Sequence, residues 1–399
     1  MLDAADLDLT HPNYRVDPYP VYARHRAEAP VCRVRAGPFG RAWLITRYDD
    51  VAAALKDERF TKDYRKVRRL DVQFLRLFGP LNRHMLSTDP PDHARLRALV
   101  QKAFTVRLVE GMRPRIESLT EQFLDRVAGQ REMDVVRDYA LLLPTTIIAE
   151  MLGVPIADRP RFLRWSSALV DFGGLLSVLR AVPSGWALLR YIRSLAKLRR
   201  QQPEDDLISA LVTAEEAGDK LTEDELLAMA SLLLVAGFET TVNLIGNGTL
   251  ALLENPAALE RLQAQPDLMP SAVEELLRYD SPIKLATPRW ALCGVTVAGE
   301  KIPQGALVAI AIASANRDPL QFERADELNL ARDPNRHLSL GQGIHYCLGA
   351  PLARLEAQIA FTTLLQRFPH MRLAVPRDAL RWRRSPPLRG LESLPVSFA

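Results

Sequence analysis

Cysteine is scarce in this chain, and its spacing suits neither a disulfide framework nor a zinc site. The three cysteines, Cys32, Cys293 and Cys347, lie far apart among 399 residues. A sparse, odd-numbered set is typical of proteins from a reducing compartment. No CxxC or HxxxH spacing supplies a second pair of zinc ligands near Cys347. We therefore expect no structural disulfide and no zinc centre.

Long apolar runs are also absent. No uninterrupted stretch approaches the roughly 18 apolar residues of a transmembrane helix. Residues 1–6 are polar and acidic, without the basic and apolar regions of a signal peptide. These absences predict no membrane span and a cytoplasmic location. The formal net charge of +4 is too weak to predict nucleic-acid binding, and no stripe of basic and aromatic residues supports it.

Helical periodicity dominates what the sequence does contain. Apolar residues recur at helical spacing in segments 94–104, 114–127, 141–152, 186–199, 205–215, 223–254, 256–264, 269–279 and 351–367. Alternating patterns predict strands at 31–34, 42–45, 293–298, 306–310 and 385–398. The expected fold is mainly α with a small β subdomain, whose β-rich portions lie near 30–60, 280–310 and 385–398.

The longest predicted helix carries polar residues in its middle. A capping box at Thr222–Glu225 begins it and Asn255-Pro256 ends it, which gives a length of roughly 48 Å. It contains the sequence Ala236-Gly237-Phe238-Glu239-Thr240-Thr241. An acid and a hydroxyl in a buried apolar helix need a reason. One is a kink in which Thr240 bonds to the preceding turn; the other is a function.

The third cysteine lies in a glycine-hinged loop, Gly341-Gln342-Gly343-Ile344-His345-Tyr346-Cys347-Leu348-Gly349, directly before a helix with Pro351 in its first turn. A single cysteine is usually a small buried hydrophobe. Here the glycines allow close backbone approach to a flat ligand, and the helix start favours the anionic sulfur. Together these features indicate a thiolate that binds a metal.

This loop resembles the cysteine-ligand loop of the cytochrome P-450 superfamily, the haem-thiolate monooxygenases, and the resemblance extends over nearly the whole chain. It implies the cytochrome P-450 fold, a triangular α-rich prism with a long central helix over the haem, as one domain over residues 1–399. It also implies haem b as cofactor, with Cys347 as the iron ligand and Gly341 and Gly349 beside it. A thiolate ligand favours O–O cleavage.

The resemblance assigns roles to other residues. Glu239 and Thr240 match the acid–alcohol pair of the oxygen-binding groove: Thr240 would hydrogen-bond dioxygen, and Glu239 would relay protons through water. Ala236 and Gly237 would leave room for oxygen. The cationic or hydrogen-bond-donating partners of the haem propionates would be His93, Arg97, Arg289 and His345. Taken singly, each of these four is as easily a solvated surface residue.

Two positions depart from the family pattern. Glu275 and Arg278 share a helix face and match the structural Glu–Arg pair, but Glu327 occupies the place where many relatives have a third arginine. Arg324 or Arg332 is expected to substitute for it. Leu340, seven residues before Cys347, stands where relatives usually carry the phenylalanine that shields the sulfur. This change predicts an altered reduction potential.

The implied reaction is the oxidation, most simply a hydroxylation, of an apolar small molecule by O2. Gly341-Gln342-Gly343 is not part of a βαβ nucleotide motif, so electrons would come from a ferredoxin or similar redox protein with its reductase. The expected docking residues are Arg95, Lys102, Arg107 and Arg354. Two alternatives remain, a peroxide-driven haem enzyme and a non-catalytic haem sensor or carrier.

Substrate-facing segments would map to 66–88, 160–190, 283–287 and 391–394. Residues 172–179 are apolar with two glycines and are expected to form a lid. Lys284 and Arg180 are candidates to bind an acidic group of the substrate, although exposure to solvent is the simpler expectation. The basic amphipathic run 189–200 is expected to be a helix with one face buried rather than a membrane-surface helix.

Overall fold

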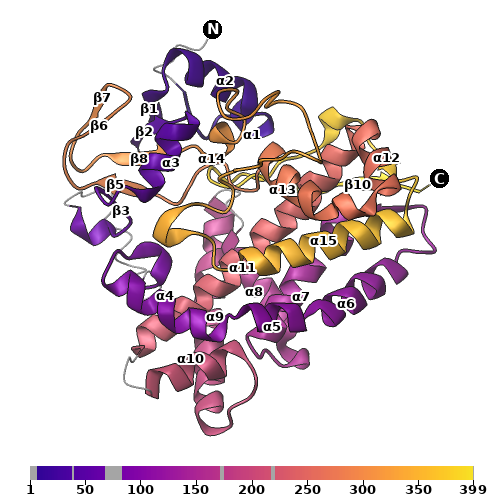
Figure 1. Ribbon diagram of the computed structural model, residues 1–399. Coiled ribbons are helices and arrows are strands. Elements are labelled where there is room, and N and C mark those ends of the chain that lie inside the picture. The colour runs from indigo at the N-terminus through magenta and orange to yellow at the C-terminus, as the bar shows by residue number, and fades with distance from the viewer. Residues whose placement is uncertain (1–6, 38–39, 68–82, 171–174, 217–220, 399) are drawn as a thin grey trace.

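The computed structural model describes residues 7–37, 40–67, 83–170, 175–216 and 221–398, and helices make up most of them (Figure 1). The helices are α1 (Pro12–Val16), α2 (Tyr19–Glu28), α3 (Tyr48–Lys56), α4 (Asp92–Ala103), α5 (Val106–Gly111), α6 (Arg113–Asp125), α7 (Leu142–Met151), α8 (Arg159–Val170), α9 (Leu175–Gln201), α10 (Leu207–Glu216), α11 (Glu223–Leu253), α12 (Pro256–Ala264), α13 (Met269–Tyr279), α14 (Ile312–Ala315) and α15 (Ala350–Arg367).

The strands lie mostly to one side of the helical body (Figure 1). They are β1 (Val31–Arg35), β2 (Arg41–Ile45), β3 (Phe60–Thr61), β4 (Glu132–Asp134), β5 (Arg289–Ala291), β6 (Val295–Val297), β7 (Glu300–Ile302), β8 (Leu307–Ile310), β9 (Arg372–Leu373) and β10 (Pro395–Ser397). The main sheet has the order β1-β2-β8-β5-β3. It therefore joins the N-terminal part of the chain to residues 289–310, as the sequence predicts.

Helix α11 runs through the middle of the molecule (Figure 1). The predicted capping box is present, because the Thr222 hydroxyl accepts from the Glu225 amide at 3.2 Å and the Glu225 carboxylate accepts from the Thr222 amide at 2.8 Å. Of the described helices, α11 alone is long and apolar enough to cross a membrane, but 72% of its apolar window is buried inside the protein. We therefore identify it as the core helix.

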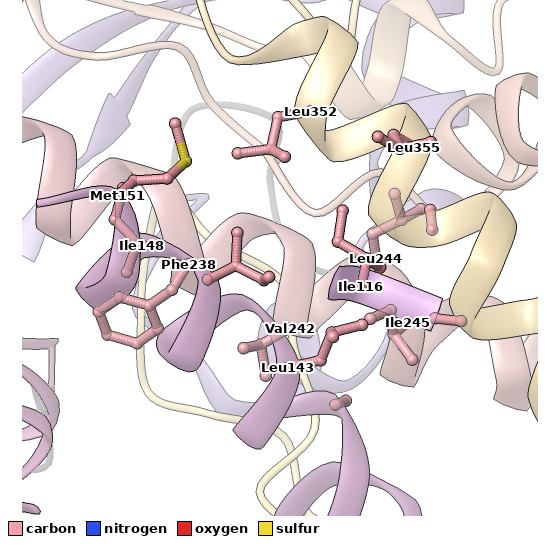
Figure 2. Close-up of a cluster of buried hydrophobic side chains, with 14 of the residues drawn as sticks. Ile116, Leu143, Ile148, Met151, Phe238, Val242, Leu244, Ile245, Leu352 and Leu355 are labelled. Atoms are coloured by element: carbon pink, nitrogen blue, oxygen red, sulfur yellow. The ribbon is translucent and has the colours of Figure 1, made fainter. Parts of the chain in front are cut away.

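Helices α6, α7, α11 and α15 enclose the largest apolar cluster, part of which is drawn in Figure 2. Phe238 and Val242 of α11 lie near Ile148 of α7, while Leu244 of the same helix lies on the side of Leu352 in α15 (Figure 2). Burying each such side chain contributes about 1.5–3 kcal/mol. This packing fixes α11 relative to α15, the helix that follows the cysteine loop.

Most helix predictions agree with the structure to within two residues, and the exceptions have physical reasons. Helix α9 begins at Leu175, eleven residues before the predicted start at 186, because Pro183 does not interrupt it. Residues 175–179 are therefore helical, while 171–174 lie outside the described residues, so the lid over 172–179 stays a prediction. Helices α1, α3, α5, α8 and α14 were not predicted. Along the basic run 189–200, Ile192, Leu195 and Ala196 are buried, so the prediction of one buried face is confirmed.

The strand predictions at 293–298 and 385–398 are only partly correct. Residues 293–298 contain just β6, which forms a hairpin with β7 through positive-φ residues Ala298 and Gly299. Within 385–398 only β10 is a strand. Pro386 and Pro387 lack amide hydrogens and cannot join a ladder, and this part of the chain instead packs against α11.

Candidate functional site

The cysteine loop is held in shape by two left-handed glycines and by backbone hydrogen bonds. Gly341 and Gly343 both have φ of 72°, a conformation that glycine adopts without strain. A Cβ on Gly343 would lie 3.3 Å from Cγ of Lys56, so the loop packs tightly on α3. The Cys347 amide donates to the Leu340 carbonyl at 2.8 Å. Helix α15 then begins, with Pro351 in its first turn.

Cys347 lines a cavity and its side chain is exposed to that cavity, although the sulfur lies well inside the protein. That burial raises the pKa of the thiol, whereas the amides of Gly349 and Ala350 and the cations Arg97 and Arg354 lower it. The expectation that the helix start favours the anion is thus correct in direction, but burial has the larger effect. A metal cation binds thiolate and not thiol, so a coordinated metal ion would deprotonate the sulfur.

The cavity is lined by Cys347 and by residues of α11, and most of its lining is apolar. Ala236, Gly237 and Thr240 line it from α11, as the sequence predicts. Gly341 and Gly349 line it from the cysteine loop. Its apolar walls include Met85, Leu86, Phe104, Ile148, Leu232, Leu233, Leu244, Ile283, Ala286 and Leu340.

One part of the cavity wall is basic. All four predicted propionate partners, His93, Arg97, Arg289 and His345, line the cavity, although they come from three different parts of the chain. The rings of His93 and His345 are 4.3 Å apart between centroids. Burial, reinforced by neighbouring cations, lowers the pKa of His93 to about 4 and that of His345 to about 2. Both imidazoles are therefore neutral near pH 7.

Arg289 is buried at the same wall. Its two terminal nitrogens donate to the carbonyls of Ala54 and Leu55, at 3.2 and 2.9 Å, at the end of α3. Burial lowers its pKa to about 10. Nε of Arg289 and Nε2 of His93 are buried and lack a hydrogen-bond partner among the described residues. Unsatisfied buried donors of this kind fit an anionic ligand group in the cavity.

Lys62 is a fifth basic residue of this wall that the sequence analysis did not find. It is buried, and burial together with the charge of Arg289 holds its pKa well below the ordinary value. Asp89 accepts from the Lys62 amide at 3.1 Å and from the Lys66 ammonium at 2.8 Å, which ties the end of β3 to the start of α4. Only this tertiary contact brings Lys62 beside His93, so no sequence motif indicates it.

The acid and the hydroxyl of α11 take different positions. Thr240 lines the cavity, and its hydroxyl donates to the Ala236 carbonyl at 3.1 Å, which is the bond to the preceding turn that a kink would use. Glu239 is 3% exposed and does not line the cavity. Burial raises the pKa of its carboxyl to about 7, partly opposed by Arg383. A Cβ on Gly237 would lie 3.2 Å from Ile148, so the lack of a side chain at this glycine also allows α7 to pack closely against α11.

The third member of the predicted Glu–Arg network is Arg332, and Arg324 is not part of it. Glu275 and Arg278 are fully buried, and two of the arginine nitrogens lie 2.7 Å from the two carboxylate oxygens. Nε of Arg332 lies 3.2 and 3.1 Å from the same oxygens. Arg324 is exposed and lies 3.6 Å from Glu327. Arg278 also donates to the carbonyl of Glu327, so that position contributes its backbone.

Only some residues of the predicted substrate-facing segments line the cavity. Ile283, Ala286 and Thr287 line the cavity, but Lys284 is 1% exposed and turns away from it. Its ammonium lies 5.1 Å from the ring centroid of Tyr14, and burial lowers its pKa to about 7. Both expectations for Lys284, a ligand for the substrate and a solvated side chain, are therefore wrong. Residues 68–82 and the side chain of Arg180 lie outside the described residues.

The four predicted docking cations differ in availability. Lys102 and Arg107 are exposed. Arg95 forms an ion pair with Glu225, and Arg354 donates to both oxygens of Glu274 at 2.6 and 2.8 Å. Arg95 and Arg354 are therefore engaged within the protein.

The donor set of this cavity fits a haem. Its lining contains the Cys347 sulfur and five basic residues, of which His93 and Arg289 have a buried nitrogen without a partner among the described residues, and the rest of the lining is largely apolar. Porphyrin has an apolar ring and two carboxylates, and its iron accepts a cysteine ligand. The residues present thus match each chemical part of the group.

Comparison with known proteins also indicates a haem protein. The family model described as Cytochrome P450 matches residues 187–381. Polyketide biosynthesis cytochrome P450 PksS of Bacillus subtilis is 47% identical over 98% of each chain. Its solved structure superposes with a TM-score of 0.92 over the whole of both chains. A myxobacterial cytochrome P450, CYP267B1, solved in complex with myristic acid, has a TM-score of 0.92 at 44% identity over 98% of each chain.

Proposed function

The chain belongs to the cytochrome P450 family and is a haem b monooxygenase, an oxidoreductase, and from this premise we propose which of its residues perform the reaction. Cys347 is the thiolate ligand of the haem iron. Arg97, Arg289 and Lys62 hold the propionates together with His93 and His345. The observation that carries this assignment is that one cavity unites the sulfur, the orphaned donors of His93 and Arg289, and the hydroxyl of Thr240.

Bound haem supplies dioxygen activation and electron transfer; the protein supplies position, a dry environment and protons. The Thr240 hydroxyl, which lines the same cavity as the sulfur, would orient dioxygen by a hydrogen bond and would pass protons to it. Glu239, one residue earlier, restores those protons. A carboxyl whose pKa is about 7 exchanges protons readily near neutral pH. The apolar lining excludes bulk water from the reacting atoms.

The proposed substrate is an apolar small molecule with a long aliphatic or polyketide chain. The described lining near Thr240 is apolar and branched, with Leu232, Leu233 and Leu244 from α11 and Ile148 from α7. Such walls select by shape and hydrophobic contact rather than by charge. The names of the two relatives point to the same chemistry, since one serves polyketide biosynthesis and the other holds a fatty acid.

The proposed electron donor is a ferredoxin, with its reductase, that docks near Lys102 and Arg107. Both cations are exposed, and they belong to α4 and the adjoining α5. A small acidic redox protein would meet them through weak contacts that depend on ionic strength. A cytoplasmic location and a single domain over 1–399 complete the proposal. The large apolar cluster joins residues from Met85 to Val396, which supports the single domain.

A ligand screen tests this function. Saturated fatty acids and macrolactones added to the ferric holoprotein should shift its spectrum from low to high spin where they displace water from the iron. A Thr240→Ala variant should then release hydrogen peroxide in place of product when driven by ferredoxin and reductase. A variant with unchanged activity would support a haem sensor or carrier instead. Full product yield from added peroxide, without electrons, would support the peroxide-driven alternative.

A further inference from the structure

A row of three polar side chains lies buried along α11, on a face that does not line the haem cavity. Glu239, Asn243 and Asn247 are spaced four residues apart and are 3%, 2% and 1% exposed. Oε1 of Glu239, both amide atoms of Asn243 and Oδ1 of Asn247 have no hydrogen-bond partner among the described residues. An unpaired buried polar group costs about 1–3 kcal/mol. Groups of this kind in folded proteins are usually satisfied by protein or by ordered water.

The row lies between two cavities, although neither is lined by the three residues themselves. At one end Glu239 adjoins Thr240, which lines the haem cavity. At the other end Ala251, the next residue at four-residue spacing, lines a second cavity of about 270 Å³. The second cavity is bordered by Asp280 and by the exposed Glu254, so it meets solvent. From Glu239 to Ala251 the helix rises roughly 18 Å, a distance that a single file of waters spans.

The segment that faces this row approaches it closely but accepts a hydrogen bond only from Asn247 among the three residues. A Cβ on Gly390 would lie 1.9 Å from Oδ1 of Asn243, so only glycine fits there. Asn247 donates to the Arg389 carbonyl at 3.1 Å, and the Arg389 side chain lines the second cavity. The Asn247 side chain is thus the point at which the row meets this cavity. The remaining unpaired atoms of the row need water.

We propose that Glu239, Asn243 and Asn247 hold a file of water molecules that carries protons from the second cavity to Glu239. An amide both donates and accepts, so Asn243 and Asn247 can order water without titrating. Each turnover consumes one O2, one substrate C–H bond, two electrons from the redox partner and two protons, and yields one alcohol and one water. Both protons enter through the file: Glu239 releases a proton toward Thr240 and takes the next from the adjoining water.

The first test is structural and independent of turnover. A high-resolution crystal structure of the haem-loaded protein should show ordered waters within hydrogen-bond distance of the four unpaired atoms. A row that is dry, with Asn243 and Asn247 bonded only to protein, would overturn the proposal. The Gly390→Ala variant should displace the Asn243 amide and remove at least the water next to it.

The second test uses ferredoxin-driven dioxygen consumption with myristic acid as the probe, in H2O and in D2O. Asn243→Leu and Asn247→Leu should slow consumption about tenfold and raise the solvent isotope effect, while the carbon-monoxide spectrum stays unchanged. Thr249→Val is the matched control on α11, because its buried hydroxyl already donates to the Ile245 carbonyl at 2.8 Å. It should behave as the parent protein.

The water file rests on the proposed role of Glu239 in proton transfer. A double variant distinguishes a failure of the water file from a failure of that role. If the residues form one route, Glu239→Gln combined with Asn243→Leu is no slower than Glu239→Gln alone. An effect of Glu239→Gln with parent-like asparagine variants refutes the water file and leaves the role of Glu239 intact. A parent-like rate for Glu239→Gln refutes that role itself. If the rate losses of the two single variants multiplied in the double variant, the asparagines would act only on structure.

Discussion

The position of Arg332 as the third charged residue of the Glu275–Arg278 network gives a quantitative prediction. Replacing Arg332 by methionine keeps the side-chain volume but removes the contacts at 3.2 and 3.1 Å to Glu275 and the bond to the Glu323 carbonyl at 2.7 Å. Hydrogen bonds to charged groups contribute about 1.5–3 kcal/mol each. Loss of a buried partner costs up to about 5 kcal/mol, but Glu275 keeps Arg278 and Asn335. We expect a loss of about 3 kcal/mol.

This loss of stability can be measured as a decrease in melting temperature. Unfolding entropy scales as about 2.1 cal/mol/K per residue, so a chain of 399 residues should lose about 4 °C in Tm. Circular dichroism of the haem-loaded protein would follow it. Arg324→Met is the matched control, because Arg324 is exposed and makes only a 3.6 Å contact to Glu327; its Tm should change by less than about 1 °C. A larger drop for Arg324→Met than for Arg332→Met would refute the assignment.

Three further predictions follow from the site. Leu340→Phe should lower the reduction potential by tens of millivolts, because a larger apolar group near the sulfur disfavours the added negative charge of the reduced state; an unchanged potential in redox titration contradicts this. Lys102→Gln with Arg107→Gln should reduce both the rate of reduction by ferredoxin and its dependence on ionic strength, whereas Arg41→Gln, also exposed, should do neither. Burial raises the pKa of Glu239 from 4.5 to about 7, so between these values the folded state binds more protons than the unfolded state and stability falls as pH rises. Relative to Glu239→Gln, the parent protein should therefore lose about 3 kcal/mol across that window in urea unfolding, and parallel pH profiles would contradict it.

Local signals in the sequence predicted the central helix and the cysteine loop. The capping box, the apolar run and Asn255-Pro256 define α11, and the glycines around Cys347 define the loop conformation. Residues that are close together in the sequence determine such features, so they can be predicted without knowledge of tertiary contacts. The four predicted residues of the basic wall do line one cavity; helical spacing linked His93 with Arg97, but only the resemblance to a family linked these two with Arg289 and His345.

What the sequence could not show depends on contacts between distant segments. Lys62 reaches the basic wall through Asp89, and Arg332 rather than Arg324 reaches Glu275 because of the path of the intervening loop. The burial of Lys284 against Tyr14 likewise has no local signature, since lysine is usually exposed. Each of these outcomes is set by packing over long sequence separations.

The account depends on the bond between Cys347 and haem iron, and the absorption spectrum of the reduced carbon-monoxide adduct tests it most directly. The parent protein should show the red-shifted Soret band of a thiolate ligand, and so should Cys293→Ser, whose sulfur is exposed and lies outside the cavity lining. Cys347→Ser should lose that band while it still binds haemin at the basic wall. A parent protein without the shifted band, or a Cys347→Ser variant that keeps it, would contradict the account.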